Sequence, residues 1–270
     1  MLAAIDGHRA ARRSINRQVL RIDRVKTILN VSAYKFVDLD DPAVLRDRVR
    51  AEGEARELKG TVLLATEGIN LVLAGDAGRL RDFTAWLRSD SRLADLVLKE
   101  SWSDAVPFGR LFVKVKREII RMGCPAVRPA AERAPAIGAA TLARWLAAGQ
   151  DDTGRPVVTL DTRNAFEVDH GAFVGAIDWR LARFGDFPAA LAAHRAELEG
   201  KTVVSYCTGG IRCEKATILM RQAGLEHVWQ LDGGILGYLG WKQDAPHWRG
   251  DCFVFDKRVT LDNALQPAGA

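Results

Sequence analysis

The chain has 270 residues, 48% of them hydrophobic and 27% charged, which excludes a disordered or fibrous protein and allows two domains of common size. No apolar run approaches the roughly 20 residues that a membrane-spanning helix needs, and the first residues lack the apolar stretch of a secretory signal, so we expect a cytoplasmic protein with no membrane partner. The formal net charge of +5 favours an anionic partner only if the excess lies within a folded domain.

Residues 1–27 form a basic N-terminal extension that carries this excess. Seven arginine and lysine residues stand against two aspartates up to residue 29, and the remaining chain has equal numbers of basic and acidic residues. Such an Arg-rich, acid-poor stretch is typical of a presequence, of a start codon placed too early, or of a solvated tail that touches nucleic acid. We interpret it as a disordered appendix without a core of its own.

Residues 28–121 predict a ferredoxin-like α+β domain. An apolar run rich in β-formers comes first, and Pro42 opens a helix. Two strands then flank the turn Thr66-Glu67-Gly68, Asp76 is placed to cap a second helix, and a last strand alternates apolar residues with basic ones. The order β-α-β-β-α-β is the split ferredoxin-like arrangement. The expected strands are 28–37, 58–65, 69–74 and 111–115, and the expected helices are 42–56 and 77–89.

A second domain follows a linker. Residues 122–136 hold three prolines and little periodicity, so we interpret them as the linker. Residues 137–245 alternate buried strands with helices, the pattern of an α/β domain with a parallel sheet. Its expected strands are 156–161, 201–206 and 227–231, and its expected helices are 141–148, 181–198 and 213–224. A C-terminal extension, 246–270, contains an apolar run at 252–256 that fits one more strand.

The candidate catalytic residue is Cys207, at the end of a buried strand and directly before a glycine turn and a helix. Backbone N–H groups of such a loop can form an anion-binding nest, the helix N-terminus adds partial positive charge, and Arg212 adds a full charge. Such sites lower a cysteine pKa from about 8.5 to roughly 3.5–7.5, so we predict a nucleophilic thiolate. The active-site loop comprises Cys207, Thr208, Gly209, Gly210, Ile211 and Arg212.

The other cysteines have weaker signatures. Cys213 lies in the first turn of the helix, where it is either a resolving thiol for Cys207 or a small packing residue. Cys124 and Cys252 are interpreted as structural, and no cysteine spacing indicates zinc or a disulfide framework. An inert buried Cys207 is disfavoured because packing does not require the glycine turn. A cysteine phosphatase has arginine six positions after its cysteine, whereas here the arginine comes one residue earlier, at Arg212.

Two sets of motifs resemble known families. The segments that resemble rhodanese domains are Asp161-Thr162-Arg163, Glu167, Gly171, Gly175-Ala176, Leu231-Asp232-Gly233-Gly234 and Trp241. Ala172 departs from that pattern, which usually has histidine there. The longer string from Tyr206 to Ala216 is similar to the rhodanese-related tRNA uridine(34) hydroxylase family, and the similarity covers about residues 28–260. It extends to Tyr34-Lys35-Phe36, Gly60-Thr61-Val62, Glu67-Gly68-Ile69-Asn70 and Cys252-Phe253-Val254-Phe255-Asp256.

This resemblance implies a tRNA-modifying enzyme that hydroxylates the wobble uridine to 5-hydroxyuridine with molecular oxygen as co-substrate, and in which the loop cysteine is essential. No flavin, haem or metal site is evident, because the five histidines show no ligand spacing with a carboxylate. The implied electron donor has no signature in the sequence, and neither has the oligomeric state. Two alternatives stay open: a sulfurtransferase that passes persulfide sulfur from Cys207 to a small molecule or tRNA, and a catalytically silent binding module.

The predicted tRNA contact is the basic face of the strand at 111–115. Phe112 shares that face with Lys114 and Lys116, so a base can stack beside charges that bind phosphate. The same pattern is typical of a solvated edge strand that lysines protect from aggregation.

Overall fold

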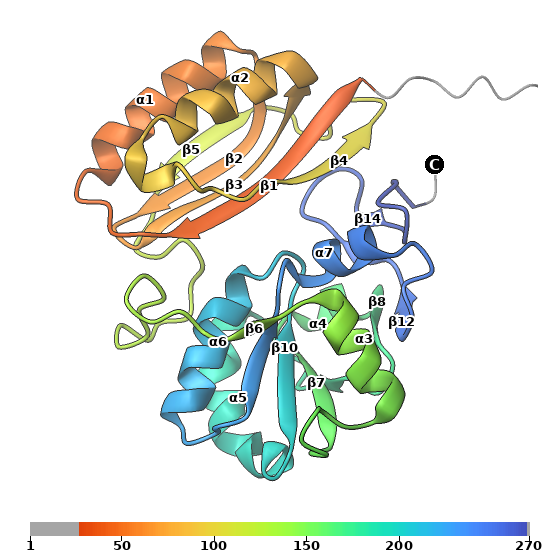
Figure 1. Cartoon of the computed structure of the whole chain (residues 1–270). Coiled ribbons are helices and arrows are strands. Elements are labelled where there is room, and N and C mark those ends of the chain that lie inside the picture. Colours follow the sequence, from red (N-terminus) through yellow and green to blue (C-terminus); the bar gives the residue numbers. More distant parts are fainter. Residues whose placement is uncertain (1–26, 269–270) are drawn as a thin grey trace, which may run out of the picture.

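The computed structural model describes residues 27–268, so the expected disorder of the basic extension falls outside the described residues. Two domains lie one above the other, and both of their sheets are visible in Figure 1. No helix in the described part of the chain is long and apolar enough to cross a membrane.

The first domain is a five-stranded sheet covered on one face by two helices. Its strands are β1 (Ile28–Phe36), β2 (Lys59–Ala65), β3 (Gly68–Asp76), β4 (Lys99–Ser103) and β5 (Leu111–Val115) in the order β4-β1-β3-β2-β5, and its helices are α1 (Pro42–Ala55) and α2 (Ala77–Arg88). The Asp76 side chain accepts a hydrogen bond from the Arg79 backbone at 3.1 Å, which caps α2 as predicted.

The closing strand of this domain differs from the prediction. The expected last strand, Leu111–Val115, is an additional strand that pairs in parallel with β2 at the far edge. The strand that completes the β-α-β-β-α-β order is β4, which pairs antiparallel with β1. Its residues, Lys-Glu-Ser-Trp-Ser, are mostly polar and show no apolar alternation, because β4 is an edge strand in which Lys99 and Ser101 line the cleft between the domains and Trp102 alone among the five is a large apolar residue packed against the core.

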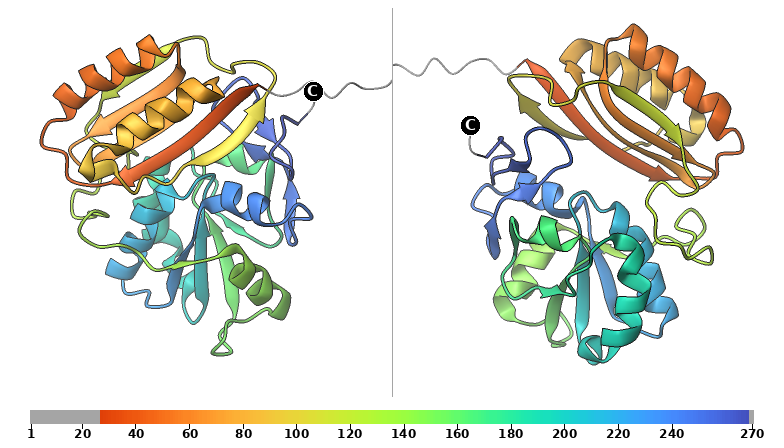
Figure 2. Two further views of the ribbon diagram at one scale, coloured as in Figure 1. Left: turned by 45° about the horizontal axis from the view of Figure 1, so that its top comes forward. Right: turned by 180° about the vertical axis from the view of Figure 1, so that it is seen from behind.

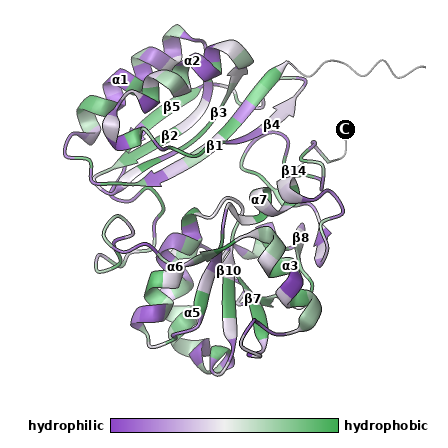
Figure 3. Ribbon diagram, in the orientation of Figure 1, coloured by the Kyte–Doolittle hydropathy of each residue, from purple (hydrophilic) through white to green (hydrophobic). Residues whose placement is uncertain are grey.

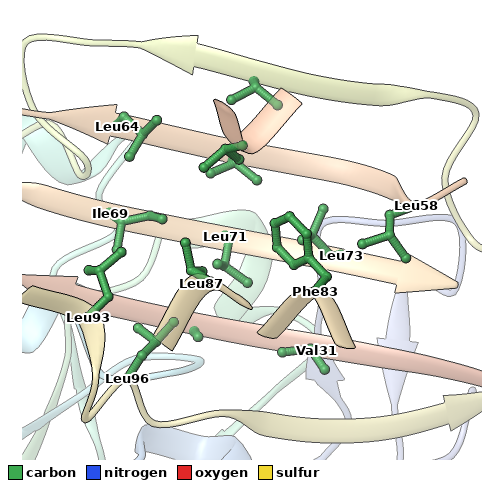
Figure 4. Packing of buried hydrophobic residues seen from close by; sticks show 14 of the residues in the cluster. Val31, Leu58, Leu64, Ile69, Leu71, Leu73, Phe83, Leu87, Leu93 and Leu96 are labelled. Carbon is green, nitrogen blue, oxygen red and sulfur yellow. The ribbon is translucent and has the colours of Figure 1, made fainter. Parts of the chain in front are cut away.

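The two faces of the first sheet have opposite character. On the helix face, leucine, isoleucine and valine side chains of β1, β2 and β3 pack against Phe83 and Leu87 of α2 (Figure 4). The other face is largely polar and is directed toward the second domain (Figure 1). Side chains of this polar face include Asn30, Ser32, Tyr34, Thr61, Asn70, Lys99 and Ser101.

The segment expected as a linker contains no helix or strand over residues 122–135. Met122, Val127 and Ala134 are nevertheless buried in the core of the second domain, so the segment packs against that domain. Its last residue already belongs to β6 (Ala136–Ile137), which joins the second sheet beside β11.

The second domain has the parallel sheet that the sequence predicted. The strands β6, β7 (Val157–Asp161), β9 (Ile177–Asp178), β10 (Thr202–Tyr206) and β11 (Val228–Leu231) lie in the order β6-β11-β10-β7-β9, and all four pairings are parallel. The central strands β7 and β10 are rich in valine and carry much of the hydrophobic colour of this sheet in Figure 3, as expected for strands covered on both faces. The helices are α3 (Ala139–Ala148), α4 (Ala165–Val168), α5 (Phe187–His194), α6 (Ile211–Gln222) and α7 (Gly234–Trp241).

The prediction of one helix over 181–198 was wrong. The structure has a short 3-10 turn at Phe184–Asp186, then α5, then a second 3-10 turn at Arg195–Leu198. Pro188 lies in the first turn of α5, and its ring would clash with the carbonyl four residues earlier in a helix that began at Leu181.

The C-terminal extension returns to the first domain. Instead of one strand over 252–256, it forms the two-residue β13 (Cys252–Phe253) paired with β14 (Thr260–Leu261), while β12 (Trp248–Gly250) pairs with β8 (Gly171–Phe173). Arg258 donates a hydrogen bond to Ser101 Oγ at 2.8 Å, and the Lys257 N–H donates to the Pro107 carbonyl at 3.2 Å. This segment therefore bridges the two domains beside β4, as both views of Figure 2 show.

Candidate active site

The loop after β10 wraps around the sulfur of Cys207. The backbone N–H of Gly210 donates to the Cys207 Sγ at 3.1 Å, and α6 begins one residue later. Gly210 has φ +101°, in the left-handed region where only glycine is unstrained, and a Cβ on it would lie 2.8 Å from the Tyr34 hydroxyl oxygen. The glycine turn predicted from sequence is therefore required both by the backbone and by the neighbouring domain.

A second glycine pair holds the loop from the other side. The N–H groups of Ile235 and Leu236, at the start of α7, donate to the carbonyls of Cys207 and Thr208 at 2.9 and 3.0 Å. Gly234 has φ +62°, and a Cβ on it would lie 2.4 Å from the Cys207 carbonyl oxygen. A side chain at this position would push α7 away from the loop.

The environment of Cys207 favours the thiolate. Burial raises the pKa of its thiol, but a hydrogen bond from Cys213, the charge of Arg212, and the N–H groups of Arg212 and Gly210 lower it further, to about 5. Cys213 is also fully buried, and its pKa is raised well above the usual range by burial and by its bond to Cys207. The pair therefore consists of one thiolate and one thiol that donates to it. Cys252, in the core, has its pKa raised to about 12 by burial.

Arg212 forms a buried ion pair with Glu167. Its two terminal nitrogens lie 2.5 and 2.7 Å from the carboxylate oxygens of Glu167, which is fully buried. Glu167 lies on α4, so this pair joins α4 to the first turn of α6. Arg212 thus supports the loop structurally as well as through its charge.

Residues of the first domain complete the surroundings of the loop. Tyr34 donates to Glu214 of α6 at 3.3 Å, and burial raises its pKa, which keeps the phenol protonated. The Lys99 ammonium lies 5.1 Å from the centroid of the Tyr34 ring. Reasoning from sequence did not identify Lys99, which carries no motif, whereas Tyr34 stands within the family string.

A buried lysine fastens the two domains together. Lys215 of α6 is 2% exposed, and its ammonium lies 2.8 Å from Glu67 and 2.7 Å from Glu118, both in the first domain. It also donates to the Ile120 carbonyl at 3.0 Å. The sheet and the cysteine loop are therefore held face to face.

Between the domains lies a cleft of about 1690 Å³. Its walls include the loop residues Cys207, Thr208, Gly209, Ile211 and Arg212, the polar sheet face with Lys99, and the segment after β5. In that segment Lys116, Arg117 and Arg121 are exposed and have no ion pair among residues 27–268. The same described residues contain no group of three or more histidine, cysteine or acidic side chains placed to hold a metal ion.

The three predicted tRNA contacts are divided between two places. Lys116 lines the cleft, whereas Phe112 lines a neighbouring depression of about 460 Å³ together with Phe108 and Phe255. The guanidinium carbon of Arg110 lies 4.1 Å from the centroid of the Phe112 ring, and the ammonium of Lys114 lies 4.9 Å from it.

The fold and the loop define a two-domain protein with an acylphosphatase-like domain followed by a rhodanese-like domain. Residues 28–119 match the family described as UPF0176 acylphosphatase like domain, and residues 142–241 match the Rhodanese-like domain. The chain belongs to the tRNA uridine(34) hydroxylase family, which confirms the resemblance found in the sequence.

Full-length relatives support this membership. The tRNA uridine(34) hydroxylase of Bordetella petrii is 62% identical over 90% of this chain and 96% of its own, and that of Delftia acidovorans is 61% identical over 89% and 92%. Among solved structures, a rhodanese-like domain from Anabaena sp matches 50% of this chain and 86% of its own with 23% identity and a TM-score of 0.36.

Proposed function

We propose that this chain hydroxylates the wobble uridine of tRNA, uridine 34, to 5-hydroxyuridine at Cys207, in the cytoplasm where tRNA is available. In the proposed reaction one oxygen atom of dioxygen enters C5 of the base, the other leaves as water, and an external donor supplies two electrons and two protons. The observation that carries the proposal is the position of the Cys207 thiolate in the wall of the interdomain cleft.

The size of the cleft favours a polymeric substrate. Its volume of about 1690 Å³ exceeds the roughly 300–1,000 Å³ typical of sites for small ligands. A wobble base belongs to a single-stranded loop, whose bases can be turned outward into such a cleft at a lower cost than bases of a duplex. A small anion would need the cysteine loop alone.

The charge of the cleft wall favours nucleic acid. Lys116, Arg117 and Arg121 are exposed along one segment and have no carboxylate partner in the described part of the chain. Unpaired cations aligned beside a cleft are available to phosphates, which supply most of the affinity in such complexes. Phe255, which is 60% exposed, lines the same cleft and offers a ring for stacking.

A sulfurtransferase is the second candidate, and the loop itself favours it. The Gly210 N–H already points at the sulfur, and the loop is a residue shorter than a phosphate-binding cysteine loop, so it suits a single outer sulfur atom. In that reaction Cys207 would carry a persulfide and transfer its outer sulfur to tRNA or to a small acceptor.

Heavy-isotope oxygen separates the two reactions. Cells that lack wobble hydroxylation are complemented with this chain and grown under heavy-isotope dioxygen, and the nucleosides of their tRNA are analysed by mass. Hydroxylation predicts heavy oxygen in 5-hydroxyuridine and no product without dioxygen. Mercury-retarded tRNA that forms without dioxygen would instead establish sulfur transfer and overturn the hydroxylase proposal. The mass of an unlabelled product decides nothing, because adding oxygen and replacing oxygen by sulfur change it almost equally.

A further inference from the structure

Side chains of the first domain lie against the glycines that build the cysteine loop. Ser32 of β1 and Lys99 of β4 are neighbours in register on the polar sheet face. A Cβ on Gly209 would lie 4.0 Å from the Ser32 hydroxyl oxygen and 4.0 Å from Lys99 Cδ, and a Cβ on Gly233 would lie 3.9 Å from Lys99 Cε. Lys99 therefore reaches across the cleft to the loop of the other domain.

Lys99 is a partly buried cation for which the described residues provide no hydrogen-bond acceptor. Among residues 27–268 its ammonium has no hydrogen bond and no ion pair. It makes a cation–π contact with the Tyr34 ring. Lys215, in the same cleft, has two carboxylates and a carbonyl. Burial lowers the pKa of Lys99, and the negative charges of Cys207, Asp232 and Glu214 partly offset this effect.

An ammonium group donates up to three hydrogen bonds, and Lys99 lines the cleft, so its donors are available to a substrate that binds there. The hydroxyl of Ser32 likewise has no hydrogen-bond partner among the described residues, so the two side chains form a pair of donors beside the loop.

We propose that Lys99 binds the O4 oxygen of the target uracil and carries the negative charge that forms on O4 when the Cys207 thiolate adds to C6. This inference rests on the proposed function and assigns a binding mode to its substrate. Ser32 is the second donor to the same oxygen. The first domain is in this way a part of the catalytic centre.

The addition needs no oxidant. The sulfur–C6 bond forms, the electron pair of the C5–C6 double bond is delocalised over C5 and the C4 carbonyl, and O4 becomes an enolate oxygen that Lys99 stabilises. The electron-rich C5 then reacts with oxygen in the proposed hydroxylation. Without oxygen, C5 takes a proton from water, and loss of a C5 proton together with release of the thiolate restores the uracil. The base then carries a hydrogen from solvent at C5.

Access to the sulfur requires movement above the loop. Cys207 is fully buried, although it belongs to the cleft wall. The Lys99 side chain can move without breaking a hydrogen bond, whereas Tyr34 is bonded to Glu214. A base that enters beside the loop displaces Lys99 and is then contacted by its ammonium.

The test is hydrogen exchange at C5 without oxygen. The purified full-length protein is incubated anaerobically with tRNA tritiated at C5 of its uridines, and release of tritium from uridine 34 is measured. We expect release with the wild type and none with Cys207→Ser. Lys99→Met should slow release about 100-fold or more, the usual cost of removing a donor to a developing oxyanion, with little change in tRNA affinity. Lys99→Arg should recover part of the rate.

The matched control is Lys201→Met, since Lys201 lies before the opposite end of β10 and outside the cleft. It should exchange as the wild type does. If Lys99→Met exchanged at the wild-type rate, the role of Lys99 would be wrong. If the wild type hydroxylated uridine 34 in cells yet never released tritium anaerobically, addition at C6 would be wrong while the proposed function stood. Absence of both activities would overturn the proposed function itself.

Discussion

Arg212 and Glu167 form a bidentate ion pair beneath the cysteine loop, with nitrogen to oxygen distances of 2.5 and 2.7 Å. Glu167 is fully buried and Arg212 is 5% exposed, so neither group can be hydrated if its partner is lost. The pair connects α4 with the first turn of α6, and the orientation of the loop depends on both helices.

Arg212→Ala should therefore lower the free energy of unfolding by about 3–5 kcal/mol, because it leaves the Glu167 carboxylate buried without a counter-charge. Urea denaturation measures the loss. Arg144→Ala is the control, since Arg144 forms an exposed pair with Asp152, and such surface pairs contribute little to stability. A similar, small effect in both variants would contradict the structural role of Arg212.

Alkylation of Cys207 should reveal its lowered pKa. The thiolate is the reactive form, so the rate of alkylation by iodoacetamide should fall as the pH drops through about 5 and stay level above it. Cys213→Ala removes a hydrogen bond to the thiolate and should move the midpoint upward. Mass spectrometry of the alkylated peptides distinguishes reaction at Cys207 from reaction at Cys124, which is partly exposed. A midpoint near 8.5 in the wild type would show that the loop does not stabilise the thiolate.

Cys207→Ser should abolish formation of 5-hydroxyuridine without unfolding the protein, because a serine hydroxyl has a far higher pKa and supplies no comparable nucleophile. The product is measured in tRNA from complemented cells, and thermal unfolding checks the fold. Cys124→Ser is the matched variant, since Cys124 packs against the core of the second domain and has no contact with the loop. Full activity of Cys207→Ser would remove this cysteine from the mechanism.

Lys215→Met should loosen the two domains. It leaves Glu67 and Glu118 without their shared cation, although both carboxylates also accept backbone N–H groups of the segment after β5. We expect a loss of about 3 kcal/mol in unfolding free energy and a larger radius in small-angle X-ray scattering. Unchanged dimensions and stability would show that other contacts suffice to hold the cleft closed.

The cysteine loop was predictable from sequence because everything that builds it is local. The end of a strand, the Gly209-Gly210 turn and the start of a helix follow Cys207 within a few residues, and each has its own sequence signature. The sequence could not show that the charge of Arg212 is shared with Glu167, because that contact depends on how two helices pack.

Lys99 was missed for a different physical reason. Its strand is short and mostly polar, because Lys99 and Ser101 line the cleft and only one large apolar residue, Trp102, packs against the core, so no apolar alternation marks it. The strand at Leu111–Val115 has that alternation and was therefore placed as the closing strand, although it pairs with β2 at the far edge. Hydrophobic periodicity identifies side chains that are buried in a core. Polar side chains that line a substrate cleft do not contribute to it, so it does not identify them.

The basic segment after β5 should dominate the salt dependence of tRNA binding. Lys116→Ala combined with Arg117→Ala removes two cations that have no protein partner among the described residues. Each phosphate contact contributes about 0.7–0.9 to the slope of log affinity against log salt, so the slope should become shallower by about 1.5.

The control for this pair is Arg144→Ala combined with Lys201→Ala, two cations that lie outside the cleft. Filter binding across a salt series compares the wild type with the two double variants, which lose the same number of positive charges. Iodoacetamide alkylation of Cys207 shows whether the loop is intact. Only the variant with Lys116→Ala and Arg117→Ala should show a shallower salt dependence of tRNA affinity. Its alkylation rate should match that of the wild type because neither side chain contacts the cysteine loop. Equal slopes in both double variants would mean that tRNA senses the overall charge of the protein rather than this wall of the cleft, and the segment would then be a solvated edge.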